Sequence, residues 1–221
     1  MWDEKKLLEI CEKYKNQAPE NVMFPEPYLP YMPDKPKKWN GILVLAEAQN
    51  FSRGGKYYEW LDKLTSEERM TRLGRKPYED KRIGVGPWDG KNGGEDEIFK
   101  FALRAIFEGA NLDLKLEDVA VSNAVPWTKK RGGSKNENPD EYMKAKAKDF
   151  WKEIFEAWDP EIKVLVVLGD MAEEVMNSAG ILKKYEGKWL KLRHPSRTNK
   201  VSYACQAVSL GVEKFKECFG T

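Results

Sequence analysis

The single histidine of this chain, His194, lies in the segment 193–196 (Arg-His-Pro-Ser), directly after the alternating apolar segment 189–192. Histidine is the side chain best suited to donating or accepting a proton near neutral pH. A histidine at a predicted strand end, followed by Pro-Ser, is therefore a candidate for proton or hydrogen-bond chemistry. The alternative is a histidine that only caps or packs.

Polar and aromatic side chains also follow the other apolar segments. Segment 42–45 leads to Glu47, Gln49, Asn50 and Phe51, and segment 118–123 ends at Asn123. In an open parallel sheet, ligands bind beyond the carboxyl ends of the strands. A carboxylate, amides, an aromatic ring and the histidine are therefore expected to converge on one edge, which is the pattern of a candidate site.

Each of these residues also has a purely structural interpretation. Glu47 can cap a helix or pair with a lysine, Asn123 can form a turn, and Ser196 can be a helix N-cap. Residues 169–170 (Gly-Asp), which follow the apolar run 164–168, indicate a tight turn into a helix. We assign that pair no chemistry.

The elements that must position these residues alternate between strand and helix. The four apolar segments, 42–45, 118–123, 164–168 and 189–192, predict strands. Hydrophobic periodicity predicts helices at 5–15, 57–72, 95–108, 139–158, 170–176 and 201–219. The alternation predicts an α/β fold, a three-layer αβα sandwich with a central, mainly four-stranded parallel sheet.

A length of 221 residues favours one domain over 1–221. Within it, residues 1–40 hold a helix and a proline-rich segment that we expect to wrap the surface, although a binding arm is the alternative. Residues 49–94 form a long polar insertion, and connections of this length are usually functional or mobile.

Composition excludes several classes. Lys+Arg number 38 against 36 Asp+Glu, so the chain is no polycation, yet a local basic face stays possible. Three scattered cysteines and one histidine argue against a disulfide framework, a zinc site and a four-cysteine cluster. We expect no metal and no cofactor. No apolar run reaches membrane-spanning length and the first residues lack a signal-peptide pattern, so we expect no membrane partner and a cytoplasmic location.

Several segments together resemble the uracil-DNA glycosylase superfamily. They are 44–48 (Val-Leu-Ala-Glu-Ala), 121–123 (Val-Ser-Asn), the apolar strand ending in Gly169, and 194–196 (His-Pro-Ser). The resemblance runs from about residue 41 to residue 199, and the first and last motifs contribute most of it. Segment 86–90 is similar in position to a segment of the superfamily whose aromatic residue stacks on the flipped base. Trp88 would be the counterpart of that aromatic residue.

The resemblance implies a DNA glycosylase that cuts the bond between a deaminated base and deoxyribose in base excision repair. His194 would donate a hydrogen bond to the base oxygen, and Glu47 would hold or activate the water. Because Gln49-Asn50 replace the proline that usually follows this motif, Gln49 or Asn50 could position the water instead. Asn123 would read the base edge, near Gln49, and Phe51 or Trp88 would stack on the base. The partner would be damaged or single-stranded DNA, because the target base must leave the stack. A monomer is expected.

Candidate phosphate contacts lie beside these residues. Ser196 and Arg197 precede the last predicted helix, whose N-terminal N–H groups suit an anion. Lys129, Lys130 and Arg131 begin a basic glycine-containing loop after the second strand. The loop can clamp the DNA backbone; the alternative is a solvated run of charge.

The chain departs from the family in four respects. Gln49-Asn50 stand where Pro-Gly or Pro-Tyr is usual, and Ala48 stands where some branches have Asp or Asn. Ala46 replaces the leading glycine, and the four cluster cysteines of the thermophile-type branch are missing. No iron–sulfur cluster is therefore carried over. Two alternatives stay open: a catalytically altered or inactive nucleic-acid-binding protein on the same fold, and an unrelated α/β protein that binds nucleotides. The lack of a G-x-x-x-x-G-K-[ST] loop argues against an ordinary NTPase.

Overall fold

The computed structural model describes residues 2–20, 22–33, 39–48, 61–72, 95–127, 139–193 and 200–221. Its strands are β1 (Ile42–Ala48), β2 (Ala120–Val125), β3 (Val164–Leu168) and β4 (Trp189–Leu192). Its helices are α1 (Glu4–Lys15), α3 (Ser66–Arg72), α5 (Glu95–Gly109), the 3₁₀ turn η2 (Leu116–Asp118), α6 (Glu141–Trp158), α7 (Asp170–Ser178), α8 (Ile181–Lys184) and α9 (Lys200–Phe219).

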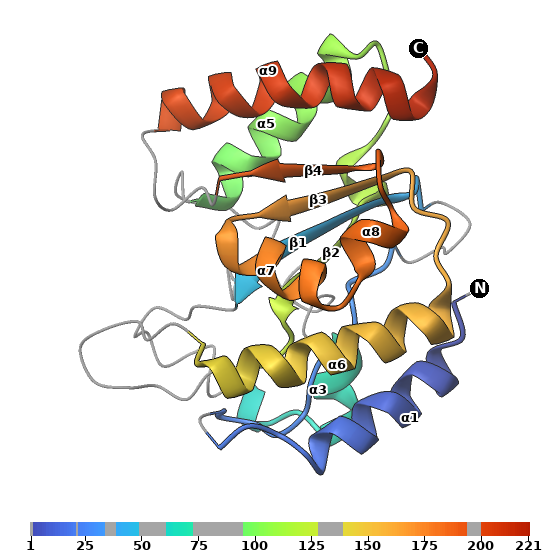
Figure 1. The fold of residues 1–221 in the computed structure, drawn as a ribbon, viewed down its shortest axis with the longest axis vertical. Helices are drawn as coiled ribbons and strands as arrows, with labels where there is room; N and C mark the ends of the chain where they lie inside the picture. Colours follow the sequence, from blue (N-terminus) through green and yellow to red (C-terminus); the bar gives the residue numbers. More distant parts are fainter. Residues whose placement is uncertain are drawn as a thin grey trace.

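The described strands form one parallel sheet in the order β2-β1-β3-β4. Each pairing is in register along the apolar segments; Leu45, for example, lies opposite Val167 on β3. Because all the strands run the same way, their carboxyl ends share one edge, where the arrowheads lie in Figure 1. The predicted four-stranded parallel sheet is confirmed.

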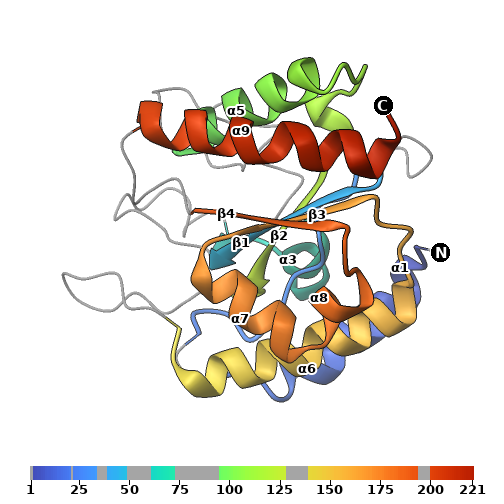
Figure 2. The ribbon, with the colours of Figure 1, turned by 45° about the horizontal axis from the view of Figure 1, so that its top comes forward.

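Helices cover both faces of the sheet and complete the three layers (Figures 1 and 2). Ile42 and Val44 pack in the cluster shared with α5 and α9, and Leu43 and Leu45 pack in the cluster shared with α6 and α7. The alternation of β1 side chains between two apolar layers explains why the strand is a continuous hydrophobic run. The αβα sandwich prediction is therefore confirmed.

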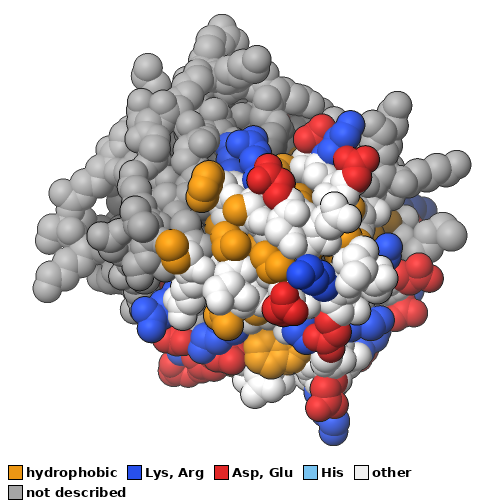
Figure 3. All heavy atoms as spheres, turned by 90° about the horizontal axis from the view of Figure 1, so that it is seen from above, with side chains coloured by type: hydrophobic (Ala, Val, Ile, Leu, Met, Phe, Trp, Pro, Cys, Tyr) orange, Lys and Arg blue, Asp and Glu red, His pale blue; other side chains and the backbone are white. Residues whose placement is uncertain are grey.

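Helices α5 and α9 approach closely because glycines lie where they cross. A Cβ on Gly211 would lie 2.7 Å from Cγ1 of Ile106, and one on Gly109 would lie 2.7 Å from Cγ2 of Val212. Phe101 on α5 and Leu210 on α9 are exposed. Figure 3 shows this face of the molecule, with hydrophobic side chains interspersed among charged ones.

The proline-rich segment packs along the outer edge of β2. Tyr31 and Val121 exchange backbone hydrogen bonds of 2.8 and 3.1 Å, and the Tyr28 N–H donates to the Pro126 carbonyl at 2.9 Å. Residues 26–33 are buried. The segment thus protects an edge strand that would otherwise present unpaired backbone groups.

Helix α3 fastens the middle of the long insertion to this segment. Arg69 donates two hydrogen bonds to the carboxylate of Glu26, both at 3.1 Å, and Glu26 is 3% exposed. Of the predicted helix 57–72, residues 61–62 and 66–72 are helical in the described part, but a single continuous helix is wrong, since residues 63–65 interrupt it. Thr65 and Glu68 explain the break, because each side chain accepts a hydrogen bond from the backbone N–H of the other residue. This reciprocal pair is a capping box, which marks the start of a new helix.

The other sequence boundaries agree with the structure within a few residues. β3 and β4 begin and end where the apolar segments predict. β1 is longer than predicted and includes Glu47, whereas β2 begins at Ala120 because Asp118 belongs to the 3₁₀ turn η2. The short helix α8 was not predicted. Glu47 is therefore part of the sheet and does not belong to a following loop.

Candidate active site at the carboxyl edge of the sheet

The candidate site lies where β1 and β3 are neighbours. From β1 the chain moves outward to β2, and from β2 it crosses back over β1 to β3 on the other side. This reversal of direction is the topological switch point, and in open α/β sheets ligands bind outside the carboxyl ends of the strands at such a point. A ligand site is therefore expected at the last residues of β1 and β3.

Glu47 on β1 packs directly against Gly169, the residue that follows β3. A Cβ on Gly169 would lie 2.8 Å from Cδ and 3.0 Å from Cγ of Glu47, so only glycine leaves room for the carboxylate. Gly169 adopts φ 91° and ψ 172°, a conformation that is essentially restricted to glycine. Its N–H donates to the carbonyl of Leu192 at 2.8 Å, which ties the turn to β4.

The carboxyl group of Glu47 also lies beside the first turn of α7, because Gly169 is the N-cap of that helix. The first N–H groups of a helix and its dipole favour a neighbouring negative charge. Glu47 is 9% exposed. A nearly buried carboxylate at a sheet edge can accept a hydrogen bond or a proton from a water molecule, and it can stabilise a developing positive charge.

Asn123 occupies the adjacent strand at nearly the same level, since it lies opposite Ala46 in the register of β1 and β2. Its Nδ2 donates to the hydroxyl of Tyr28 at 2.8 Å. Tyr28 is 4% exposed, and burial raises the pKa of its phenol, so the hydroxyl stays neutral across the physiological range. Asn123 thus has an amide whose position a buried hydroxyl helps to fix.

Glu47 and Asn123 reach the edge from opposite faces of the sheet. Successive side chains of a strand alternate between faces. Glu47 shares the face of Leu45, toward α7, whereas Asn123 shares the face of Val121, toward α5. A ligand that contacts both residues must therefore lie beyond the strand ends rather than over one face.

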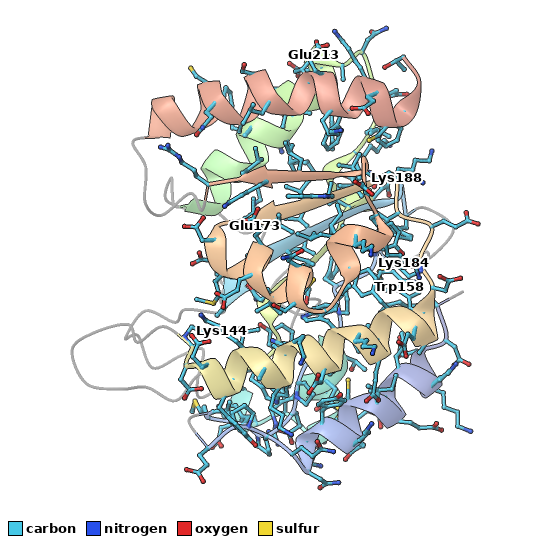
Figure 4. All side chains as sticks on the ribbon, in the orientation of Figure 1. Lys144, Trp158, Glu173, Lys184, Lys188 and Glu213 are labelled. Atoms are coloured by element: carbon cyan, nitrogen blue, oxygen red, sulfur yellow. The ribbon has the colours of Figure 1, made fainter. Side chains whose placement is uncertain are left out.

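Paired charges surround this end of the molecule. Lys191 on β4 binds Asp170 at 2.7 Å and Glu173 at 2.5 Å, and these hydrogen bonds raise the pKa of Lys191. Lys144 on α6 likewise binds carboxylates of α6 and α7. Figure 4 places Glu173 and Lys144 at the end of the molecule where the strands finish. Both lysines hold elements together, so neither is a ready phosphate contact.

Most of the predicted site residues lie outside the described residues. The described chain stops after Ala48, Trp127 and Arg193, at the carboxyl ends of β1, β2 and β4. The following predicted residues fall beyond those points: Gln49, Asn50, Phe51, Trp88, Lys129, Lys130, Arg131, His194, Ser196 and Arg197. Of the predicted set, the structure places Glu47 and Asn123, and it brings them to the same edge.

Sequence reasoning missed two residues of this edge. Gly169 was interpreted only as a turn, yet its missing side chain makes the space for Glu47. Tyr28 lies in the proline-rich segment, which was expected to wrap the surface, yet its hydroxyl contacts Asn123. The sequence signal for the first is a glycine directly after the apolar segment 164–168. No local sequence pattern indicates the contact of Tyr28 with Asn123, because 95 residues separate them.

The sequence matches no protein-family model and no curated protein. Within the described residues, no group of three histidine, cysteine or carboxylate side chains is arranged to hold a metal ion. Among the helices of those residues, none combines the length and the apolar character needed to cross a membrane.

Proposed function

We propose that this protein is a DNA glycosylase that hydrolyses the N-glycosidic bond of uracil or another deaminated base in DNA, as in base excision repair. The observation that carries the proposal is the position of Glu47, a nearly buried carboxylate at the switch point of the parallel sheet. Asn123 on the neighbouring strand supports it, as does the place of His194 in the sequence, two residues after β4. The motif resemblance supplies the reaction class.

In the proposed reaction, the bond between C1′ of the deoxyribose and the base nitrogen breaks, and the base leaves with the electron pair. Positive charge builds on the sugar and negative charge on the base. Glu47 would stabilise the sugar cation and accept a proton from the water that adds to C1′. His194 would donate a hydrogen bond to the base oxygen, an effect worth about 10²–10³ in rate. Asn50 would lie near the water.

Recognition of the base falls to Asn123 in this proposal. A carboxamide presents an N–H donor and a carbonyl acceptor side by side. That pair is complementary to a base with a C=O next to an N–H, which uracil, hypoxanthine and xanthine share. Gln49 is assigned to the same base, and Phe51 or Trp88 would stack on that base once it is extruded.

Binding of the DNA backbone is assigned to residues that follow β2 and β4. Ser196 and Arg197 precede α9, and Lys129, Lys130 and Arg131 follow Trp127. Lys144 and Lys191 are already paired with carboxylates. Phosphate contacts therefore fit the basic residues beyond the strand ends better than these two lysines.

The test is base release from labelled single- and double-stranded oligonucleotides that carry uracil, hypoxanthine or xanthine, with alkali to cut the abasic sites. Wild type is compared with His194→Ala, Glu47→Ala and the control Glu161→Ala, which removes an exposed acid near the amino end of β3. We expect release that falls at least 100-fold in the first two variants and not in the control. Binding without release from any substrate would refute the enzyme and leave the inactive nucleic-acid-binding protein.

A further inference from the structure

We propose that Tyr28, a residue of the proline-rich segment, is a positioning residue that holds Asn123 for recognition of the base; this inference rests on the proposed function. The observation is the 2.8 Å hydrogen bond from Nδ2 of Asn123 to the Tyr28 hydroxyl. It joins a segment far from Asn123 in the sequence to the carboxyl end of β2.

Tyr28 is itself fixed from two directions. Its backbone N–H donates to the Pro126 carbonyl, just after β2, at 2.9 Å. The next residue, Leu29, donates to the Met70 carbonyl on α3, also at 2.9 Å. Because Tyr28 as a whole is only 4% exposed, its side chain has little freedom to move. A rigid hydroxyl therefore holds one end of the Asn123 amide.

This contact matters because an amide reads a base only in one plane and one orientation. With one Nδ2 hydrogen directed at Tyr28, the second Nδ2 hydrogen and Oδ1 keep a defined direction. Loss of the hydroxyl frees the amide to rotate, so its donor and acceptor no longer meet the base without an ordering cost. Recognition weakens although Asn123 remains.

The variant Tyr28→Phe removes only the hydroxyl oxygen. Its matched control is Tyr185→Phe, because the hydroxyl of Tyr185 is also buried and donates to the Pro160 carbonyl at 2.8 Å, at a place unrelated to Asn123. Thermal melts of both variants report the cost of losing a buried hydroxyl bond. A difference between the two variants in base recognition then separates positioning from stability.

The experiment measures kcat/KM for uracil release by wild type, Y28F, Y185F, N123A and the double variant Y28F/N123A. We expect Y28F to lose about tenfold, the size of one hydrogen bond, and Y185F to keep the wild-type value. The double variant should be no slower than N123A, because the hydroxyl acts through the amide. An unchanged Y28F, or losses that multiply in the double variant, would overturn the inference.

A second measurement separates this inference from the proposed function. If wild type releases no base, the glycosylase proposal fails, and fluorescence titration with uracil- and cytosine-containing oligonucleotides tests Tyr28 instead. We expect wild type and Y185F to prefer the uracil oligonucleotide and Y28F to lose that preference. Equal discrimination by wild type and Y28F, including none by either, would overturn the role of Tyr28.

Discussion

Replacing Gly169 with alanine is expected to damage both the stability and the activity of this protein. The new Cβ would lie 2.8 Å from Cδ of Glu47, and the backbone at φ 91°, ψ 172° strains any residue with a side chain. The backbone strain costs about 1–3 kcal/mol. The forced displacement of the glutamate adds about 1–3 kcal/mol.

The assay is urea unfolding of wild type, Gly169→Ala, Glu47→Ala and the double variant. In the Glu47→Ala background the displaced side chain is gone, so alanine at 169 should cost only the backbone term. The control is Gly180→Ala, at φ 76° with nothing within 4 Å of the new Cβ, which should lose about 1–2 kcal/mol and keep full activity. Equal costs of Gly169→Ala with and without Glu47 would refute the packing of these two residues.

Two further predictions concern the frame around the site. Gly211→Ala should lower the free energy of unfolding by about 1–3 kcal/mol in urea titrations, because its Cβ would overlap Ile106; no loss would contradict the close crossing of α5 and α9. Burial raises the pKa of Glu26, but hydrogen bonds from Arg69, from the backbone and from Ser66, together with the charge of Arg69, outweigh it and lower that pKa. The pair should therefore stabilise the fold at neutral pH, and this stabilisation should be lost as pH falls below the usual glutamate range near ~4.3. The free energies of unfolding of wild type and Arg69→Met should be compared from pH 7 to pH 3. We expect the variant to be about 3–5 kcal/mol less stable at pH 7 and this difference to decrease in acid. A difference that stays constant with pH would contradict the stabilising role of the Glu26–Arg69 pair.

The layers of the fold follow from local patterns. The apolar segments at β3 and β4 match the strands residue for residue. β3 is buried on both faces and is a continuous hydrophobic run, whereas β4 alternates buried and partly exposed residues, as an edge strand does. The break before α3 was missed although Thr65 and Glu68 form a capping box that is visible in the sequence. Here hydrophobic periodicity masked a helix start.

The site was only partly predictable for a different reason. Glu47 and Asn123 could be found because strand ends of a parallel sheet share an edge. Their partners depend on tertiary contacts: Gly169 lies beside Glu47 only once β3 pairs with β1, and Tyr28 reaches Asn123 only once the proline-rich segment lies along β2. Which face each side chain takes likewise follows from register, which strand propensity does not specify.

The most direct test of the central proposal is the single-turnover rate of uracil release from a single-stranded oligonucleotide by wild type and Glu47→Gln. Glutamine keeps the size of the side chain beside Gly169 and removes the negative charge. We expect wild type to release uracil at a measurable rate and Glu47→Gln to release it at least 100-fold more slowly, with equal affinity of both proteins for the oligonucleotide. Equal rates in the two proteins, or no release by wild type, would contradict it.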